Sequence, residues 1–296
     1  MIPFLITYGI LLLKLTEGMN MNKWIALSVI TCLLLSLGSL AFADESYDEY
    51  WIESQGKQIY GRLYTPEGAV GPCPTVILSH GFGSTWEEAK LYIPRFLDCG
   101  VSCYVFDFPG GAMKNQSDGD FLDMSVMTEK QHLLDIIDTI SAHPMVDKLM
   151  LAGFSQGGAV TGLAAVERAD KIVGEILFYP ALCISDMGHE AYLNKEDIPD
   201  APKAFWQTVG KRYYEDVWDI DLVEEVTRYD GQVLMFHGTN DPAVNHVYSV
   251  RACEKFHHAN LILLSRISHG FGETTVERIF PNIITFMEQI GLIGAE

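Results

Sequence analysis

Short runs of apolar residues recur along the chain after residue 70 and are separated by longer mixed segments. Six of them have strand length and are almost continuously apolar: Thr75–Leu78, Cys103–Phe106, Leu149–Ala152, Glu175–Phe178, Val233–Phe236 and Leu261–Leu264. Strands that are buried on both faces of a sheet have this pattern, whereas half-exposed strands alternate apolar and polar residues. The pattern therefore predicts six buried strands.

The segments between these runs have helical periodicity. Residues 128–143 repeat leucine and isoleucine at helical spacing, with Thr128 and Gln131 as a capping box at the start, and residues 156–169 are rich in Gly and Ala. Strands that alternate with helices predict an α/β fold with a doubly wound, mostly parallel sheet. Two runs nearer the amino terminus are predicted to form antiparallel strands at the edge of this sheet: Tyr50–Ser54 and Gln58–Thr65.

One segment breaks the alternation. Residues 184–230, after the strand that ends at Phe178, contain no run of strand length. So long an insertion in a compact domain is usually functional, and we predict a helical cap over the active site, inserted after the sixth core strand. Its aromatic residues are candidates either for substrate binding or for packing of the cap onto the body: Phe205, Trp206, Tyr213, Tyr214 and Trp218.

Residues 1–43 form a leader whose composition differs from that of the rest of the chain. Residues 21–43 have the three parts of a secretory signal peptide: a basic start at Lys23, an apolar run over residues 24–40, and Ala41-Phe42-Ala43 as the cleavage site. The sequence therefore predicts a mature domain over residues 44–296 that is secreted or held in the cell envelope, with no membrane association after cleavage. An uncleaved anchor is the alternative, because the run is about the minimum length for a bilayer span.

Residues 1–18 precede this signal and include a second apolar run that has no role in a signal peptide. We hypothesise that translation starts at Met19 or Met21, so that residues 1–18 are not translated; a tandem leader is the alternative. Amino-terminal sequencing of the exported protein checks this: a start at Asp44 indicates cleavage, and an intact Met1 contradicts the hypothesis.

Composition and charge narrow the functional classes. Apolar residues make up 48% of the chain and charged residues 20%, which is ordinary for a globular protein with a sizeable core. The formal net charge of −19 repels phosphate backbones, so nucleic-acid binding is excluded. Cys99 and Cys103 flank a turn into a predicted core strand, which favours buried cysteines over a metal pair, and no cysteine and histidine cluster has the spacing of zinc ligands.

A G-x-S-x-G motif lies between a predicted buried strand and a predicted helix. It is formed by residues 153–157 and has Ser155 at its centre. In this context the serine occupies a sharp turn at the carboxyl end of the sheet, where open α/β folds bind ligands, and the helix amino terminus favours developing negative charge. Ser155 is therefore the candidate nucleophile.

A serine nucleophile needs a base, and the base needs a carboxylate that orients it. His269, just after the last predicted strand, is the candidate base, and Asp241, just after the preceding strand, is the candidate acid. The weaker alternatives are Asp186 for the acid and four other histidines for the base: His237, His246, His257 and His258. The chain order Ser155, Asp241, His269 is the order found in serine hydrolases with this strand–turn–helix motif.

Acyl transfer also needs hydrogen-bond donors for an oxyanion. His80-Gly81-Phe82-Gly83 follows the strand Thr75–Leu78, and the backbone amides of Phe82 and Gln156 are the candidate donors. His80 is predicted to stabilise the turn. These elements all lie at the carboxyl ends of separate predicted strands.

On these motifs the chain resembles the α/β-hydrolase superfamily from about Tyr50 to Gly291. The cap and the loops at residues 107–111 and 117–126 are most similar to the cinnamoyl or feruloyl esterase branch and its serine-aminopeptidase-like relatives. The resemblance implies a secreted serine hydrolase that cleaves a small-molecule carboxylic ester through an acyl-enzyme, with no metal and no organic cofactor.

Two other functions remain open at this stage. A serine peptidase or amidase would use the same three residues, and a non-catalytic binding protein of this fold would be expected to lack one of them. The sequence identifies neither the acyl group nor the oligomeric state.

Overall fold

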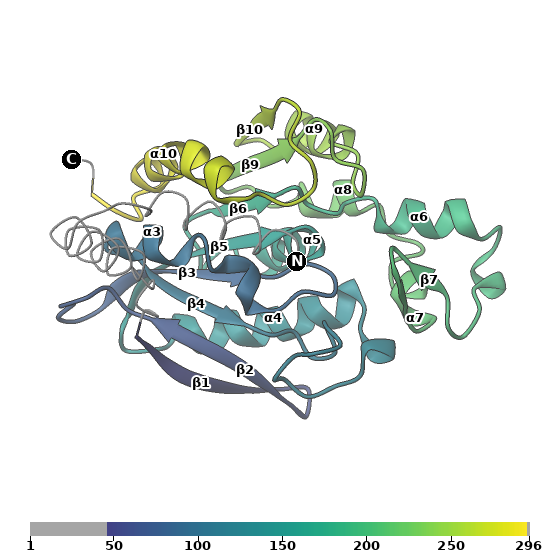
Figure 1. Cartoon of the computed structure of the whole chain (residues 1–296), viewed down its shortest axis with the longest axis horizontal. Coiled ribbons are helices and arrows are strands. Elements are labelled where there is room, and N and C mark those ends of the chain that lie inside the picture. Colours follow the sequence, from purple (N-terminus) through teal and green to yellow (C-terminus); the bar gives the residue numbers. More distant parts are fainter. Residues whose placement is uncertain (1–45, 295–296) are drawn as a thin grey trace, which may run out of the picture. The chain divides into compact units, whose positions relative to one another are not determined.

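The computed structural model describes residues 46–294, so the predicted leader, residues 1–43, lies outside the described residues. Eight strands form one sheet in the order β1-β2-β4-β3-β5-β6-β9-β10. β1 and β2 are antiparallel to their neighbours, and the other strands are parallel to one another. The predicted doubly wound, mostly parallel sheet with an antiparallel edge is therefore confirmed (Figure 1). The strands are β1 Tyr47–Ser54, β2 Lys57–Tyr64, β3 Cys73–Ser79, β4 Ser102–Phe106, β5 Val146–Phe154, β6 Glu175–Phe178, β9 Val233–Gly238 and β10 Ala259–Leu264.

Helices cover both faces of the sheet (Figure 1). One face packs against α4 (Val126–Ser141), α5 (Gln156–Glu167), α8 (Leu222–Val226) and α9 (Val247–Lys255), and the other against α3 (Ile93–Asp98) and α10 (Glu273–Gln289). The central strands β4 and β6 are buried along their whole length. β10 is different: as the edge strand it exposes part of its surface, and Leu263 is 43% exposed, so the prediction that Leu261–Leu264 is buried on both faces was wrong.

Helix α4 begins two residues before the predicted start. The side chain of Ser125 accepts a hydrogen bond from the Thr128 amide, and the Thr128 hydroxyl accepts one from the Ser125 amide. This capping box replaces the predicted pair of Thr128 and Gln131. Both residues of the pair are polar and lie one turn apart, so sequence spacing alone did not separate the two pairs.

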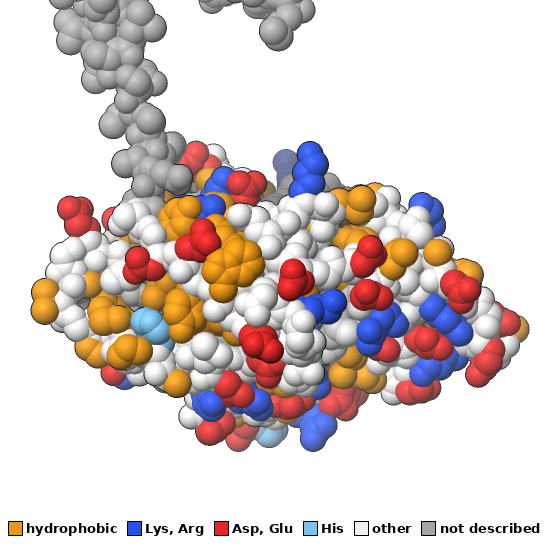
Figure 2. Space-filling model, turned by 90° about the horizontal axis from the view of Figure 1, so that it is seen from below, with side chains coloured by type: hydrophobic (Ala, Val, Ile, Leu, Met, Phe, Trp, Pro, Cys, Tyr) orange, Lys and Arg blue, Asp and Glu red, His pale blue; other side chains and the backbone are white. Residues whose placement is uncertain are grey.

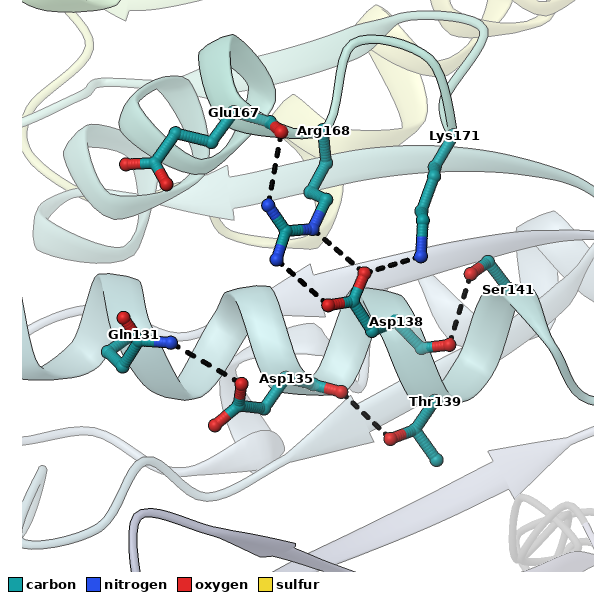
Figure 3. A network of polar contacts seen from close by, with 8 residues as sticks. All are labelled: Gln131, Asp135, Asp138, Thr139, Ser141, Glu167, Arg168 and Lys171. Carbon is teal, nitrogen blue, oxygen red and sulfur yellow. Dashed lines mark hydrogen bonds and ion pairs between the residues drawn. The ribbon is translucent and has the colours of Figure 1, made fainter.

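A charged cluster joins the carboxyl-terminal halves of α4 and α5. Arg168 donates two hydrogen bonds of 2.8 Å to the carboxylate of Asp138, and Lys171 forms an ion pair with the same group (Figure 3). The bonds from Arg168 outweigh the effect of burial and lower the pKa of Asp138 to about 2. The two helices that flank the predicted nucleophile are thus joined at the end far from it.

The predicted cap, residues 184–230, consists of short elements. They are α6 Ile184–Ala191, a 3-10 turn at Lys195–Asp197, strands β7 Lys203–Ala204 and β8 Gln207–Thr208, α7 Arg212–Glu215, and α8. The prediction of a purely helical cap missed the β7–β8 hairpin, because strands of two residues leave no periodic pattern. Helix α8 packs against α5 in the body, with Val226 close to Gly162, so the part of the segment that stands away from the sheet ends before α8 (Figure 1).

Glu175, at the start of β6, is a buried carboxyl group without a partner. The residue is fully buried, and neither carboxylate oxygen has a hydrogen-bond partner among the described residues. Burial raises the pKa of Glu175 to about 8, because the charged form is not solvated there. In the folded protein the carboxyl group therefore keeps its proton at neutral pH.

This raised pKa gives stability a pH dependence with a definite sign. Between the ordinary pKa of 4.5 and the raised value of about 8, the folded chain binds a proton that the unfolded chain has lost, so stability falls as the pH rises. Each pH unit in this window costs up to about 1.4 kcal/mol. Glu175→Gln removes the ionisation, so its melting temperature should exceed that of the wild type increasingly from pH 5 to pH 8. Glu67→Gln, at an exposed position, is the control and should show no such trend.

The described surface carries charges of both signs. Figure 2 shows acidic and basic side chains interspersed on one face, with apolar side chains between them. Among residues 46–294, no helix combines the length and the apolar character that a bilayer span requires.

Candidate active site

Ser155 occupies the turn between β5 and α5, in a strained backbone conformation. Its φ is +51° and its ψ is −117°, a region that side-chain-bearing residues rarely adopt. The flanking glycines are required by close packing: a Cβ on Gly153 would lie 2.3 Å from the Gly157 carbonyl oxygen, and one on Gly157 would lie 2.3 Å from the His80 carbonyl oxygen. The local sequence thus permits a turn that presents the Ser155 hydroxyl at the end of the sheet.

The structure brings Ser155, His269 and Asp241 together in one hydrogen-bonded chain. His269 Nε2 lies 3.0 Å from Ser155 Oγ, and His269 Nδ1 lies 2.6 Å from Asp241 Oδ2. Asp241 follows β9 and His269 follows β10, so the three residues come from three strand ends that the parallel topology places at one edge of the sheet. The Asp241 side chain is completely buried, whereas that of His269 is 23% exposed, so solvent reaches the candidate base but not the candidate acid.

Asp241 accepts hydrogen bonds from other groups besides His269. Its Oδ1 accepts hydrogen bonds from the amides of Ala243 and Val244, and its Oδ2 also lies 3.2 Å from His237 Nε2. Burial by itself would raise the pKa of Asp241, but the bonds from His237, His269 and Val244 outweigh it and hold the pKa well below the usual range. The group is therefore an anion whenever the chain is folded at ordinary pH.

His237 has a role that sequence reasoning missed. It is fully buried, its Nδ1 contacts the Ser249 hydroxyl at 2.7 Å, and its Nε2 faces both the Val244 carbonyl and Asp241. Two acceptors at Nε2 fit a tautomer with the proton there, which then points at the carboxylate. His237, a weaker alternative for the base in the sequence analysis, therefore holds the candidate acid in place.

The candidate oxyanion loop lies directly against Ser155. A Cβ on Gly81 would be 3.0 Å from the Ser155 Cβ, so a side chain at that position would press on the turn that carries the nucleophile. His80 stabilises the turn as predicted: its Nε2 accepts a bond from the Phe108 amide and its Nδ1 donates to the Gly81 carbonyl. Within residues 46–294, neither of the predicted donors, the amides of Phe82 and Gln156, makes a hydrogen bond, so both can serve an incoming oxygen.

Glu88 is a second residue that the sequence did not reveal. Its carboxylate accepts a 2.8 Å hydrogen bond from the Gly81 amide, and its other oxygen lies 3.4 Å from the Tyr179 hydroxyl. The Tyr179 ring in turn packs edge-on against His269, with 4.8 Å between ring centroids. Glu88 therefore fixes the nearby loop that carries the Phe82 amide and links it to Tyr179, which is remote in sequence.

The five cap aromatics do not share one environment. Trp206, at the tip of the β7–β8 hairpin, is 64% exposed and approaches Gly83, and the half-buried Phe205 packs on Phe82 beside it. Tyr213 and Tyr214 are buried, so the structure does not place them on a substrate-binding surface. Trp218 packs against His189 and lines a separate hollow. Only two of the five predicted substrate contacts therefore lie at the exposed side of the oxyanion loop.

The weaker candidates lie elsewhere. Asp186 accepts a hydrogen bond from the Tyr248 hydroxyl, and His257 forms an exposed ion pair with Asp230. His246 lies beside His237, where its ring centroid is 6.4 Å away. None of these three residues has a described contact with Ser155. The described residues also contain no group of three or more His, Cys, Asp or Glu side chains that could hold a metal ion.

A cavity of about 430 Å³ lies between the β1–β2 turn, the start of α4 and Arg212. Most of its lining residues are polar or charged, and they include neither Ser155, Asp241 nor His269. It is therefore distinct from the candidate active site.

Comparison with known proteins supports the assignment of the fold. A family model described as serine aminopeptidase, S33, matches residues 71–216. The structure of Est1E from Butyrivibrio proteoclasticus with ferulic acid bound superposes with a TM-score of 0.76 at 25% sequence identity, covering 82% of this chain and 100% of that one. None of the curated proteins matches the sequence.

More distant structures share the fold alone. The alpha/beta hydrolase domain-containing protein 10 from mouse gives a TM-score of 0.70 at 16% identity and covers 82% of this chain and 99% of its own. The Pyrococcus furiosus esterase Pf2001 gives 0.59 at 17% identity, with coverage of 82% and 92%. Enzymes described as hydrolases and esterases therefore recur among the structures that resemble this chain.

Proposed function

Because the chain belongs to the α/β-hydrolase superfamily, we propose that it is a serine hydrolase that cleaves carboxylic esters through an acyl-enzyme. The observation that carries this proposal is the hydrogen-bonded chain from Ser155 through His269 to Asp241, with two unengaged backbone amides beside the serine. The nucleophile has a base within hydrogen-bond distance, the base has a carboxylate that orients it, and the two amides can bind an oxyanion.

The proposed reaction uses these groups in sequence. His269 Nε2 takes the hydroxyl proton as Ser155 Oγ attacks the ester carbonyl carbon, and Asp241 stabilises the resulting imidazolium. The carbonyl oxygen becomes an oxyanion that accepts hydrogen bonds from the Phe82 and Gln156 amides. The C–O bond then breaks, the alcohol leaves with the proton from His269, and water hydrolyses the acyl-enzyme by the same steps.

For the substrate we propose an ester with an aromatic acyl group, of the cinnamoyl or feruloyl class. Support comes from Est1E, whose structure contains ferulic acid, and from the exposed indole of Trp206 beside Gly83 and Phe82. An aromatic acyl group with its carbonyl at the Phe82 amide would lie within reach of this indole. Stacking of this kind is worth about 0.5 to 1.5 kcal/mol beyond the burial of area.

Replacement of Trp206 tests this substrate class. Trp206→Ala should lower kcat/KM for methyl ferulate about 2-fold to 10-fold more than for a short acetyl ester, because an acetyl group uses little of the indole surface. Trp218→Ala is the matched control, since that tryptophan packs against His189, and it should change both esters equally. Equal losses of kcat/KM on both esters in Trp206→Ala would contradict an aromatic acyl group and indicate a general carboxylesterase.

The description of the matching family model favours a second candidate, a serine peptidase or amidase. The same three residues would carry that reaction with an amine as the leaving group. Purified enzyme offered methyl ferulate, a short acetyl ester and an aminoacyl amide distinguishes the candidates. Amide turnover that exceeds turnover of both esters would favour the peptidase.

We also propose that the enzyme acts outside the cytoplasm, on the basis of the signal-peptide pattern in residues 21–43. Amino-terminal sequencing of the exported protein, with Asp44 as the expected first residue, tests this.

A further inference from the structure

Tyr213 of the cap contacts both residues whose amides form the candidate oxyanion hole. Its hydroxyl donates a 2.8 Å hydrogen bond to Gln156 Oε1, and its ring packs against the Phe82 ring with 5.5 Å between centroids. Phe82 lies in the loop after β3, whereas Gln156 begins helix α5 after β5. Among the described contacts of the cap, Tyr213 thus joins the two halves of the hole.

The Gln156 side chain is held at its other end by the body. Its Nε2 donates a 2.7 Å hydrogen bond to Glu129 Oε2 and lies 3.3 Å from Met124 Sδ. Gln156, Glu129 and Tyr213 are all at least 99% buried. Each polar atom of the Gln156 amide therefore has a partner, and the side chain has no freedom to rotate without losing one in a site that water does not reach.

The position of Gln156 makes this network relevant to the reaction. It is the first residue of α5 and follows Ser155 directly, so its side chain is the anchor nearest to the amide that would bind the oxyanion. Burial raises the pKa of Glu129 to about 8, although the bond from Gln156 opposes this. A carboxyl group that keeps its proton adds no negative charge beside a developing oxyanion.

We propose that Tyr213 is a positioning residue of the oxyanion hole. It fixes the Phe82 and Gln156 amides relative to each other through its contacts with the Phe82 ring and with the Gln156–Glu129 pair. The cap is then part of the catalytic machinery and does more than cover the substrate. The inference rests on the proposed function, because it assumes that the Phe82 and Gln156 amides bind an oxyanion. A hole that is displaced slightly binds the transition state less well, and errors near 1 Å cost on the order of 100-fold in rate.

The test compares two adjacent tyrosines of α7. Tyr213→Phe keeps the ring on Phe82 and removes the bond to Gln156, and Tyr213→Leu removes both contacts. Tyr214→Phe is the matched control, because the Tyr214 hydroxyl donates instead to the Lys203 carbonyl within the cap. On a short acetyl ester, kcat should fall about 10-fold in Tyr213→Phe and further in Tyr213→Leu, with KM nearly unchanged, and Tyr214→Phe should stay within about 2-fold of the wild type.

A second readout separates this inference from the choice of substrate. A fluorophosphonate reacts with an activated serine by forming the Oγ–P bond and releasing fluoride, and its phosphoryl oxygen occupies the oxyanion hole. The rate of labelling at Ser155 should fall in the same order as kcat across the tyrosine variants. Glu129→Leu, which cannot accept the bond from Gln156, should lose more than Glu129→Gln, which can. Melting temperatures identify any variant that fails to fold. The inference is tested by the labelling rates of the variants that fold.

The possible results distinguish failure of the Tyr213 inference from failure of the proposed ester hydrolysis. If Tyr213→Phe and Tyr214→Phe label at equal rates, the inference is overturned. If Tyr213→Phe raises KM for methyl ferulate while labelling is unchanged, Tyr213 is a substrate contact and the inference is also overturned. Labelling of a wild-type enzyme that hydrolyses none of the esters would contradict the proposed ester function alone, and the comparison of labelling rates would still test Tyr213. A wild-type enzyme that is not labelled at all contradicts both proposals.

Discussion

Replacing Ser155 with alanine is expected to lower ester turnover about 10⁶-fold, because the nucleophile and its proton acceptor act as one unit. The Ser155 Oγ atom is the group that contacts His269 Nε2, and an alanine methyl cannot form the acyl-enzyme. A residual rate above that of water would come from the oxyanion hole and substrate binding. A chromogenic ester assay with the purified variant measures the loss. More than a few per cent of wild-type activity in the folded variant would show that another residue is the nucleophile.

The same position offers a control for folding. Ser155→Ala keeps a Cβ at a φ of +51°, so its melting temperature should be near that of the wild type. Ser155→Gly removes the Cβ and relieves the strain, so its free energy of unfolding should exceed that of Ser155→Ala by about 1 kcal/mol. Both variants should be inactive, and only their stabilities should differ.

The elements of the body and the mostly parallel arrangement of its strands could be predicted because they depend on local patterns. Continuous apolar runs marked the buried strands, and the glycines around Ser155 marked the turn between β5 and α5. The parallel topology then brought the ends of β5, β9 and β10 to one edge, as the chain order of Ser155, Asp241 and His269 required. The leader prediction concerns residues outside the described part of the chain and stays a prediction.

Side-chain environments in the cap could not be predicted in the same way. Trp206 and Tyr213 lie only seven positions apart, yet one is exposed beside Gly83 and the other is fully buried on Phe82 and Gln156. The difference arises from a hairpin of two-residue strands and a single helical turn, elements too short to produce a hydrophobic period. The partners that hold the site, such as Glu88 on Gly81 and His237 on Asp241, are close in sequence, but each pair includes a residue of an irregular loop, where no periodic pattern indicates which groups meet.

The second large effect is expected at the acid. Asp241→Asn should lower turnover about 10⁴-fold. In the native site Oδ1 accepts bonds from the amides of Ala243 and Val244, so the asparagine oxygen should stay there and its NH₂ group should face His269 Nδ1. The imidazole must then accept at Nδ1 and carry its proton at Nε2. An Nε2 that carries a proton cannot take one from Ser155.

The same substitution should also cost stability, which distinguishes it from a purely kinetic defect. With the amide in that orientation its NH₂ group meets His237 Nε2, and with the amide flipped it meets the Ala243 and Val244 amides. Either orientation sets donor against donor in a buried site, at a cost of about 1 to 3 kcal/mol. Steady-state kinetics and thermal melting of Asp241→Asn measure the two losses. Asp186→Asn, which disturbs only the bond from Tyr248, should keep nearly full activity, and the reverse pattern would move the acid to Asp186 in α6.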